Sequence, residues 1–409
     1  MSATRRDFMK SAGLLGFGAT VPNFLAKTAH AAPMANTKGA KDTILVVVQL
    51  TGGNDGLNTV IPFADAEYAK LRPTLKIARD QVLKLNDSIG LHPSMTGFAE
   101  LHQDNALCVV QGVGYPNPSQ SHFRSMDIWQ AGSTADELTE GWIGKALKGM
   151  KNAPSFHIAA GNESAPLALN GAPARVPSIT TLQDFQLKTA SATGNEMTDQ
   201  RKLIERTSMP TGQGNLLDFV QRTAVNTYAS SQRLQELAKN YVPKVTYPQT
   251  TLANRLQLAA QLIDAEIGAR IFYVSIDGFD THANQATGHA NLLTQVSDAI
   301  TAFYKDMSAR GHKDRLMVLT FSEFGRRAGE NGSRGTDHGS GAPMFLVGGK
   351  VQNGLVGAHP SLTKLEDGNL VHAIDFRQVY AGILDSWLGV DSKSVLGKDY
   401  KPVDVLTKK

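Results

Sequence analysis

The chain has 409 residues, of which 41% are hydrophobic and 19% are charged, with 38 glycines and 17 prolines. This is an ordinary globular composition, and it excludes collagen-like, coiled-coil and intrinsically disordered chains. The single cysteine, Cys108, excludes an intrachain disulfide and any zinc or iron–sulfur site built from several cysteines.

Most of the formal net charge of +4 lies at the N-terminus. Residues 1–31 hold four Lys and Arg and one Asp, a net charge of +3, so residues 32–409 carry about +1. A nucleic-acid-binding protein needs an excess of basic side chains on its folded part to neutralise phosphates. The charge balance therefore argues against nucleic acid as a partner.

Residues 1–31 have the three parts of an export signal. The basic start contains the pair Arg5-Arg6, an uncharged and weakly apolar stretch covers 11–26, and a small-x-small cleavage motif ends at Ala31. Adjacent arginines are typical of the twin-arginine type, and the middle stretch is shorter than the roughly 20 residues of a membrane span. We therefore expect export by the twin-arginine translocase, cleavage near Ala31 and a periplasmic mature protein without a transmembrane segment.

The rest of the chain alternates between buried apolar runs and amphipathic helices. The first run, Ile44–Leu50, is β-branched and lacks polar alternation, which is typical of a strand covered on both faces. Further strands are expected at 106–111, 270–276, 316–321 and 343–347, and helices at 94–103, 252–266, within 289–308 and at 376–388. This order predicts an α/β fold with a doubly wound, mostly parallel sheet and helices on both faces.

Residues 151–250 interrupt this alternation. Proline- and glycine-rich loops are mixed there with polar helical stretches. We expect this helical and loop region to be an insertion or cap within an α/β domain of residues 32–409. Substrate choice is expected to lie in it.

Polar side chains follow the predicted strands at their carboxyl ends, where ligands bind in open α/β sheets. Carboxylates and imidazoles in such a place suit a divalent metal ion such as Zn, Mn, Mg or Ca. A serine at a helix start is placed to attack an ester while free backbone N–H groups hold an anionic oxygen. The candidate residues are, in chain order, Asp55, Ser121, Asp280, His282, Glu323 and His338.

Each candidate also has a purely structural interpretation. Asp55 lies in a glycine-rich turn, where Gly and Asp are common because they tolerate positive φ. Ser121 is a good N-cap, and Glu323 is placed to form a salt bridge with Arg326 or Arg327. Chance would scatter such residues over both sheet edges, so their convergence on one edge favours a site. The turn before Asp55 lacks the G-x-G-x-x-G spacing, which argues against a nicotinamide or flavin oxidoreductase.

Together with the leader, five motifs carry a resemblance to a known family. They are QLTGGNDGLN at 49–58, SHFRS at 121–125, DTH at 280–282, SEFGR at 322–326 and GTDHG at 335–339. The chain resembles the domain-of-unknown-function-1501 family, which has no known activity. That family is similar in turn to the alkaline phosphatase and sulfatase superfamily of metal-dependent hydrolases and transferases, which implies an alkaline phosphatase-like fold.

The resemblance also implies roles for the early motifs. Asp55 matches the superfamily's metal-binding Asp after the first strand. Ser121 matches its nucleophile, with Ser119 as a second candidate. Asp280 and His282 match its Asp/His metal pair, although the superfamily usually spaces that pair by four residues.

The late motifs match less completely. Glu323 falls at the Asp of the superfamily's Asp-His-Gly motif, and His338 matches its late metal-binding His. Phe324 stands where the superfamily has another metal-binding His. This departure makes a two-metal site doubtful and is compatible with a single metal or with a site that has lost catalysis.

These observations predict a periplasmic, metal-dependent hydrolase that acts on small anionic substrates, namely phosphate or sulfate esters. Ser121 is the expected nucleophile, and the other five candidate residues are the expected metal ligands. The alternative is a non-catalytic periplasmic binding or assembly protein on the same fold, which the replacement of a metal ligand by Phe324 favours.

Overall fold

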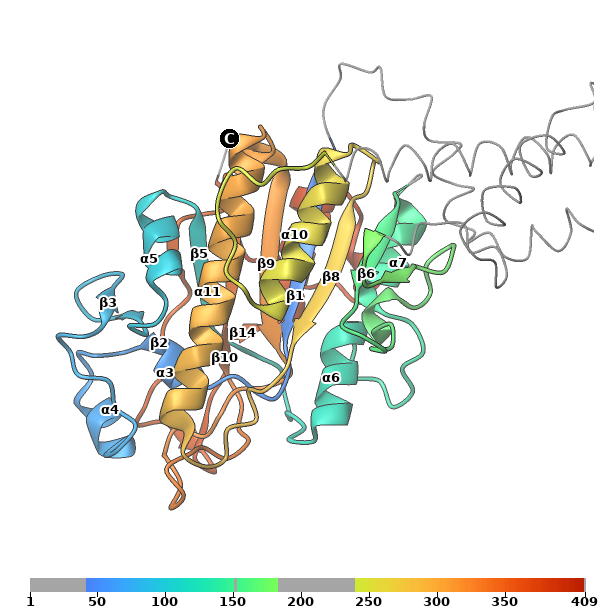
Figure 1. Cartoon of the computed structure of the whole chain (residues 1–409). Coiled ribbons are helices and arrows are strands. Elements are labelled where there is room, and N and C mark those ends of the chain that lie inside the picture. The colour runs from blue at the N-terminus through green and yellow to red at the C-terminus, as the bar shows by residue number, and fades with distance from the viewer. Residues whose placement is uncertain (1–41, 151–152, 183–239, 408–409) are drawn as a thin grey trace, which may run out of the picture.

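The computed structural model describes residues 42–150, 153–182 and 240–407. The expected export signal at 1–31 and residues 183–239 of the expected insertion lie outside these ranges. Within the described ranges, none of the helices combines the length and apolarity that crossing a membrane requires. These ranges form one large sheet with helices packed on both faces (Figure 1).

The large sheet is mostly parallel, as the sequence predicts. Its strand order is β11 (Gly354–Val356), β5 (Leu107–Gly114), β10 (Ala342–Gly348), β9 (Leu316–Ser322), β1 (Ile44–Leu50), β8 (Ile271–Ile276), β6 (Ser155–Ile158) and β7 (Ser178–Ile179), with β14 (Ile374–Asp375) also paired to β5. β1 is parallel to β8 and β9 on its two sides. β10 runs antiparallel to both of its neighbours, β9 and β5. Two small sheets lie outside the large one: β2 (Val60–Ile61), β4 (Gly90–Leu91) and β3 (Leu83–Lys84) form one, and β12 (Leu365–Glu366) and β13 (Asn369–Leu370) form the other.

Helices cover both faces of this sheet. The α-helices of the described residues are α3 (Gly56–Thr59), α4 (Ala66–Leu71), α5 (Thr96–Gln103), α6 (His122–Ala131), α7 (Trp142–Gly149), α10 (Thr251–Asp264), α11 (Gln285–Ala309), α12 (Phe376–Ile383), which continues into the π-helical turn η5 (Leu384–Leu388), and α13 (Ser392–Leu396), and of these α4 packs in a separate small cluster. Figure 1 shows α10 and α11 lying across the front face of the sheet.

The residues of β1 explain why both faces are covered. Successive side chains of a strand point to opposite faces. Val46 and Val48 join the hydrophobic core cluster formed with α5, α10 and α11. Leu45 and Val47 join the cluster formed with α6, α7, α12 and α13. All seven residues of β1 are therefore buried, which accounts for a run that is apolar apart from Gln49.

Part of the region expected as an insertion or cap contributes to the sheet. β6 pairs with β8 and β7 pairs with β6, both in parallel. All four residues of β6 are buried, and their pairing makes β6 part of the sheet instead of a cover over it. Residues 153–182 thus extend the α/β core.

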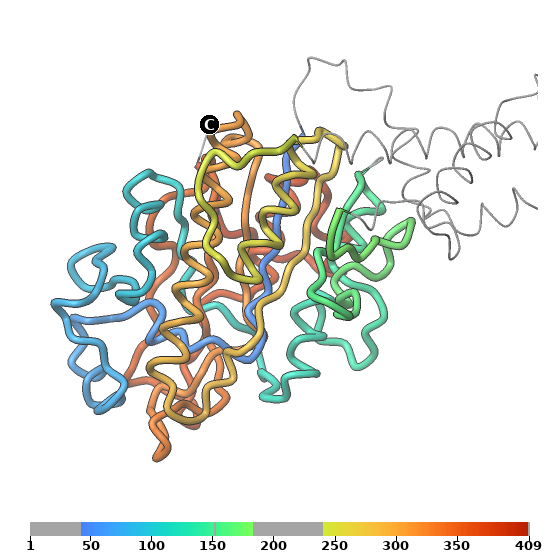
Figure 2. The backbone as a smooth tube through the Cα atoms, in the orientation of Figure 1, coloured from blue at the N-terminus to red at the C-terminus, as the bar shows by residue number. Residues whose placement is uncertain are grey.

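Two glycines bring the ends of the central strands close together. Gly52 and Gly53 follow β1 with positive φ values of 118° and 78°. A Cβ on Gly52 would clash with the backbone nitrogen of Asp280, and a Cβ on Gly53 would clash with the Phe324 ring. Glycine is needed here because the segments after β1, β8 and β9 pack against one another at the lower edge of the view in Figure 2.

Candidate metal centre

Ser121 lies at the start of α6, as the sequence predicts. It is the N-cap residue, and α6 begins at His122. Ser121 is exposed and its side chain makes no capping hydrogen bond, whereas its backbone N–H donates to Ser119 Oγ at 3.2 Å. The hydroxyl of Ser121 is therefore not committed to capping this helix.

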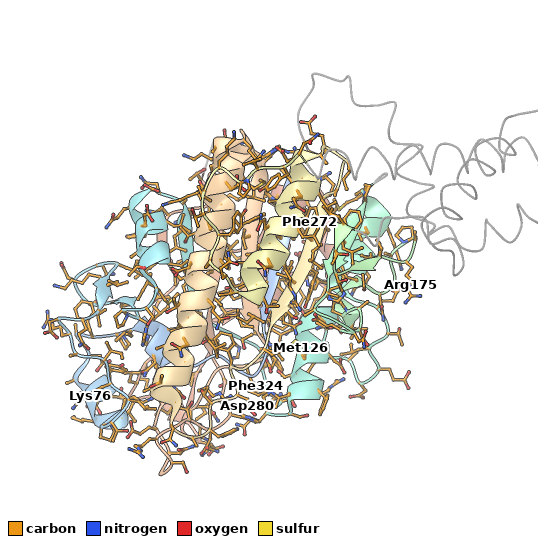
Figure 3. The ribbon with its side chains drawn as sticks, viewed as in Figure 1. Lys76, Met126, Arg175, Phe272, Asp280 and Phe324 are labelled. Atoms are coloured by element: carbon orange, nitrogen blue, oxygen red, sulfur yellow. The ribbon has the colours of Figure 1, made fainter. Side chains whose placement is uncertain are left out.

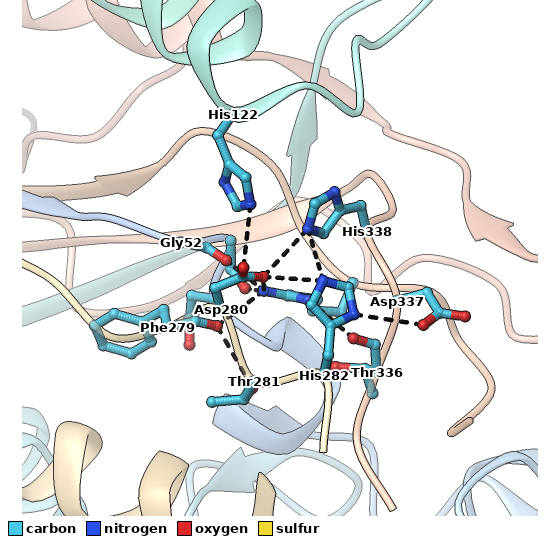
Figure 4. A network of polar contacts seen from close by, with 12 residues as sticks. Gly52, His122, Phe279, Asp280, Thr281, His282, Thr336, Asp337 and His338 are labelled. Atoms are coloured by element: carbon cyan, nitrogen blue, oxygen red, sulfur yellow. Dashed lines mark hydrogen bonds and ion pairs between the residues drawn. The ribbon is translucent and has the colours of Figure 1, made fainter. Parts of the chain in front are cut away.

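Three imidazoles surround the carboxylate of Asp280, and we call these four residues the histidine cluster (Figure 4). His338 Nε2 lies 3.2 Å and His282 Nε2 lies 3.1 Å from Asp280 Oδ1. His122 Nε2 lies 3.5 Å from Asp280 Oδ2. The ligand atoms of His122, Asp280 and His338 all lie within 4.8 Å of one another, which is close enough for one metal ion.

The other ring nitrogen of each histidine faces an acceptor. His122 Nδ1 lies 2.8 Å from a Glu323 carboxylate oxygen, and His338 Nδ1 lies 2.9 Å from the backbone oxygen of Gln120. His282 Nδ1 lies 3.5 Å from a carboxylate oxygen of Asp337. If a metal ion took the Nε2 lone pairs, the imidazole protons would lie on Nδ1, where these oxygens would accept them.

The arrangement has the donor set of a cation site. His282 Nε2 and His338 Nε2 are only 2.9 Å apart, and both face Asp280 Oδ1. Lone pairs held this close repel unless a cation or an extra proton lies among them. His122 Nε2 is also buried without a hydrogen-bond partner among the described residues. Imidazole nitrogens and a carboxylate are ligands that suit a divalent metal ion. The second nitrogen of each histidine faces an oxygen, and such contacts orient metal-binding imidazoles.

Two buried side chains hold the histidine cluster in place. Glu323 accepts the backbone N–H of Gly52 at 2.8 Å and has no exposed surface. Arg326 donates to Asp280 Oδ1 at 2.7 Å and to the backbone oxygen of Gly53 at 2.6 Å. Partial burial alone would raise the pKa of Asp280, but hydrogen bonds from Arg326 and His338 lower it to about 2. Asp280 is therefore a carboxylate at neutral pH.

Asp55 is placed apart from the histidine cluster. Its two carboxylate oxygens accept from Arg72 Nη1 at 2.6 Å and Arg72 Nη2 at 2.9 Å. Gln285 Nε2 donates to Asp55 Oδ2 at 2.5 Å. Burial alone would raise the pKa of Asp55, but the Arg72 charge and hydrogen bonds lower it to about 2. Asp55, which the sequence predicts as a metal ligand, is thus paired with the Arg72 guanidinium.

Phe324 lies beside the histidine cluster, at the same end of the sheet as Asp280 (Figure 3). Its ring centroid is 4.9 Å from that of His122 and 4.7 Å from that of His338. The ring also lies against Gly53, where a Cβ would clash with it. The residue that departs from the superfamily motif therefore forms an apolar wall beside the histidine cluster.

The structure brings together Asp280, His282 and His338 from the predicted set. Glu323 reaches the histidine cluster through His122, and Ser121 adjoins it through the chain. His122 was not among the expected ligands, although it directly follows Ser121 in the SHFRS motif. Arg72 carries no local signal, because its contact with Asp55 depends on the packing of α4 against the end of β1.

A protein-family model described as "Protein of unknown function (DUF1501)" matches residues 42–398. No curated protein matches this sequence. Solved structures that resemble it include a protein in the alkaline phosphatase superfamily from Vibrio parahaemolyticus, with 11% identity, 89% of this chain and 70% of that chain covered, and a TM-score of 0.41.

Two further structures are similar at the same low level. One is the C-terminal periplasmic domain of EcEptC from Escherichia coli, in complex with Zn, with 10% identity, 76% of this chain and 74% of that chain covered, and a TM-score of 0.35. The other is alkaline phosphatase from the Antarctic bacterium TAB5, with 10% identity, 75% of this chain and 92% of that chain covered, and a TM-score of 0.32. The assignment of site residues therefore rests on the chain's own side chains.

Proposed function

Because this chain belongs to the family of proteins of unknown function DUF1501, its activity has to be inferred from its own site, and we propose that it is a metal-dependent hydrolase of phosphate or sulfate esters. The observation that carries the proposal is the convergence of three imidazole Nε2 atoms on the Asp280 carboxylate, with His122 Nε2 buried and without a hydrogen-bond partner among the described residues. Such a geometry favours a bound cation over a purely structural network.

His122, Asp280 and His338 would hold the cation, and His282 Nε2 adjoins them. The protein fixes these ligands through Glu323 and the backbone oxygen of Gln120, which orient the rings of His122 and His338. A divalent cation bound there would supply positive charge that stabilises developing oxyanions. The twin-arginine leader supports the proposal that this site works in the periplasm after cleavage near Ala31.

Ser121 is the proposed nucleophile. It is exposed at the start of α6, next to His122. Its Oγ forms a bond to the phosphorus or sulfur atom while the bond to the alcohol breaks, and the hydroxyl proton leaves to solvent. Water then cleaves the serine ester and restores the hydroxyl. Backbone N–H groups in the first turn of α6 are oriented to hold a nonbridging oxygen of the substrate.

A chelation and ester panel tests this function. The protein is stripped with a chelator, supplied with Zn, Mn, Mg or Ca, and assayed on phospho- and sulfoesters. We expect hydrolysis of at least one ester that chelation abolishes and metal restores. Ser121→Ala should lower kcat by roughly a thousandfold or more. The matched control, Ser394→Ala on α13, removes an exposed hydroxyl elsewhere.

Two results would overturn parts of the proposal. Hydrolysis that Ser121→Ala leaves intact would remove Ser121 from the reaction. A wild-type protein that holds a stoichiometric cation but hydrolyses no ester would favour the non-catalytic binding protein instead.

A further inference from the structure

The Asp55–Arg72 ion pair lies at the same sheet edge as the histidine cluster. Both side chains are almost fully buried, with 1% and 0% of their surface exposed. Arg72 donates to both Asp55 oxygens and also to the backbone oxygens of Ala328 at 2.7 Å and Arg327 at 3.0 Å. Four donated hydrogen bonds leave the guanidinium nearly saturated, since it has five N–H groups.

A cation at Asp55 would have to displace Arg72 from its carboxylate. The remaining Asp55 contact, from Gln285 at 2.5 Å, occupies the same oxygen that Arg72 Nη1 binds. Removing one partner from a buried ion pair leaves the other charge unpaired in a low-dielectric surrounding, which is strongly unfavourable. Arg72 therefore competes with a metal ion for Asp55 from within the chain.

Phe324 adds no ligand for a second cation. Its ring packs on His122 and His338 and lies against Gly53. A ring carbon cannot bind a cation in the place of the imidazole that the superfamily motif has there. The guanidinium on Asp55 and the apolar ring at position 324 thus both argue against a second cation beside the histidine cluster.

The fixed charges around the histidine cluster nearly cancel. Asp280, Glu323 and Asp337 are carboxylates that contact its imidazoles, and Arg326 binds Asp280. Arg327 is exposed and close enough to Asp337 to lower the pKa of that carboxyl. Counting the imidazoles as neutral ligands, the fixed charges leave one net negative charge. One divalent cation would make the site positive by one charge, whereas two cations would make it positive by three.

We infer that Arg72 takes the place of a second cation beside Asp55, so that the site holds one divalent cation and acts on singly charged esters, either sulfate monoesters or phosphodiesters. This inference rests on the proposed function. A site with one excess positive charge complements a singly charged ester, while a doubly charged phosphate monoester calls for more positive charge.

A metal titration tests the inferred number of bound cations. Stripped protein is titrated with Mn or Zn alone by calorimetry, and bound metal is counted by elemental analysis. We expect one cation per chain in the wild type and in Asp55→Asn, with dissociation constants within about threefold of each other. The control Asp280→Asn should weaken binding by roughly a hundredfold.

The outcomes of the titration separate the two proposals. Two cations in the wild type, or a lower count in Asp55→Asn, would overturn this inference and leave the proposed function standing. No cation in the wild type would overturn the proposed function itself. If Asp55→Asn does not fold, the wild-type count decides, because the inference requires one cation per chain.

A matched ester series tests the inferred charge of the substrate. The probes are p-nitrophenyl sulfate and bis(p-nitrophenyl) phosphate, which carry one charge, and p-nitrophenyl phosphate, which carries two at about pH 8 because its second pKa is about 6. We expect kcat/KM for at least one singly charged ester to exceed that of the doubly charged ester by roughly tenfold or more. The two singly charged probes distinguish sulfate monoesters from phosphodiesters. An equal or higher value for p-nitrophenyl phosphate would overturn the assignment of substrate charge.

Discussion

Asp55 and Asp280 are two carboxylates that follow neighbouring parallel strands, yet their surroundings differ. Asp55 is buried. Arg72 donates to both of its carboxylate oxygens, and Gln285 donates to one of them. Asp280 has 47% of its side chain exposed and faces three imidazoles. Both carboxyls nevertheless have pKa values lowered to about 2.

A lowered pKa therefore does not separate a structural from a functional carboxylate. Ion pairs inside a fold lower a pKa as effectively as an active site does. The separating feature is what remains unpaired around each carboxylate. Arg72 completes the surroundings of Asp55, whereas His122 Nε2 beside Asp280 has no hydrogen-bond partner among the described residues. Asp55 and its partners should matter most to stability, and Asp280 and its imidazoles should matter most to ligand binding.

The largest expected effect comes from breaking the Asp55–Arg72 pair. Arg72→Met leaves Asp55 buried and unpaired, so the free energy of unfolding should fall by about 3–5 kcal/mol. Urea denaturation measures this. Arg327→Met, which removes an exposed guanidinium nearby, should change stability by less than about 0.5 kcal/mol. A loss below about 1 kcal/mol in Arg72→Met would mean that the pair contributes little to the fold.

The next effect concerns pH and the buried histidine beside Asp55. Burial lowers the pKa of His289 from 6.5 to about 4, and its Nε2 lies 2.9 Å from Asn54 Oδ1. The folded-state pKa of His289 lies below the unfolded value. The part of the free energy of unfolding that depends on neutral His289 is therefore fully present above pH 6.5 and is lost as pH falls towards 4. The loss amounts to roughly 3 kcal/mol.

Stability measured across this window tests the interpretation. The free energy of unfolding of the wild type should decline between about pH 6.5 and 4. His289→Gln, which keeps a side-chain donor for Asn54, should show a shallower decline. Parallel curves for the two proteins would show that His289 does not titrate with unfolding.

The central fold could be predicted because its signal is local. The run Ile44–Leu50 is apolar apart from Gln49, and the structure gives β1 the same bounds. The direction of β10 could not be predicted, since a buried strand is apolar whether it runs parallel or antiparallel. Residues 153–182 contain only the short strands β6 and β7, which are too brief for a clear pattern.

The site could be predicted only in part, because it depends on which partners each side chain meets. Asp280, His282 and His338 follow or precede strands that share an edge, and they do meet. Asp55 satisfies the same rule but is captured by Arg72, which lies 17 positions further along the chain. The role of Glu323 became clear only when the structure placed it against His122 Nδ1. The order of strands in the sequence thus predicts which residues lie near one another, but side-chain packing decides which of them pair.

A smaller effect is expected when Glu323 loses its charge. Glu323→Gln keeps the volume of a fully buried side chain but weakens the hydrogen bond that orients His122. Removing such a supporting carboxylate typically lowers metal affinity by about 10–100-fold, or about 1.4–2.7 kcal/mol. Titration of the stripped protein with Zn or Mn measures this shift. Unchanged affinity would show that His122 is oriented without Glu323 or does not bind the cation.

The smallest effect is expected at the exposed counterpart of Glu323. Asp337 faces His282 Nδ1 at 3.5 Å, with 53% of its side chain exposed, and also accepts from Asn331. Solvent screens this contact, so Asp337→Asn should lower metal affinity by less than about tenfold. The same titration, run beside Glu323→Gln, gives the comparison. If Asp337→Asn costs as much affinity as Glu323→Gln, then His282 binds the cation as firmly as His122, and the centre has a fourth protein ligand.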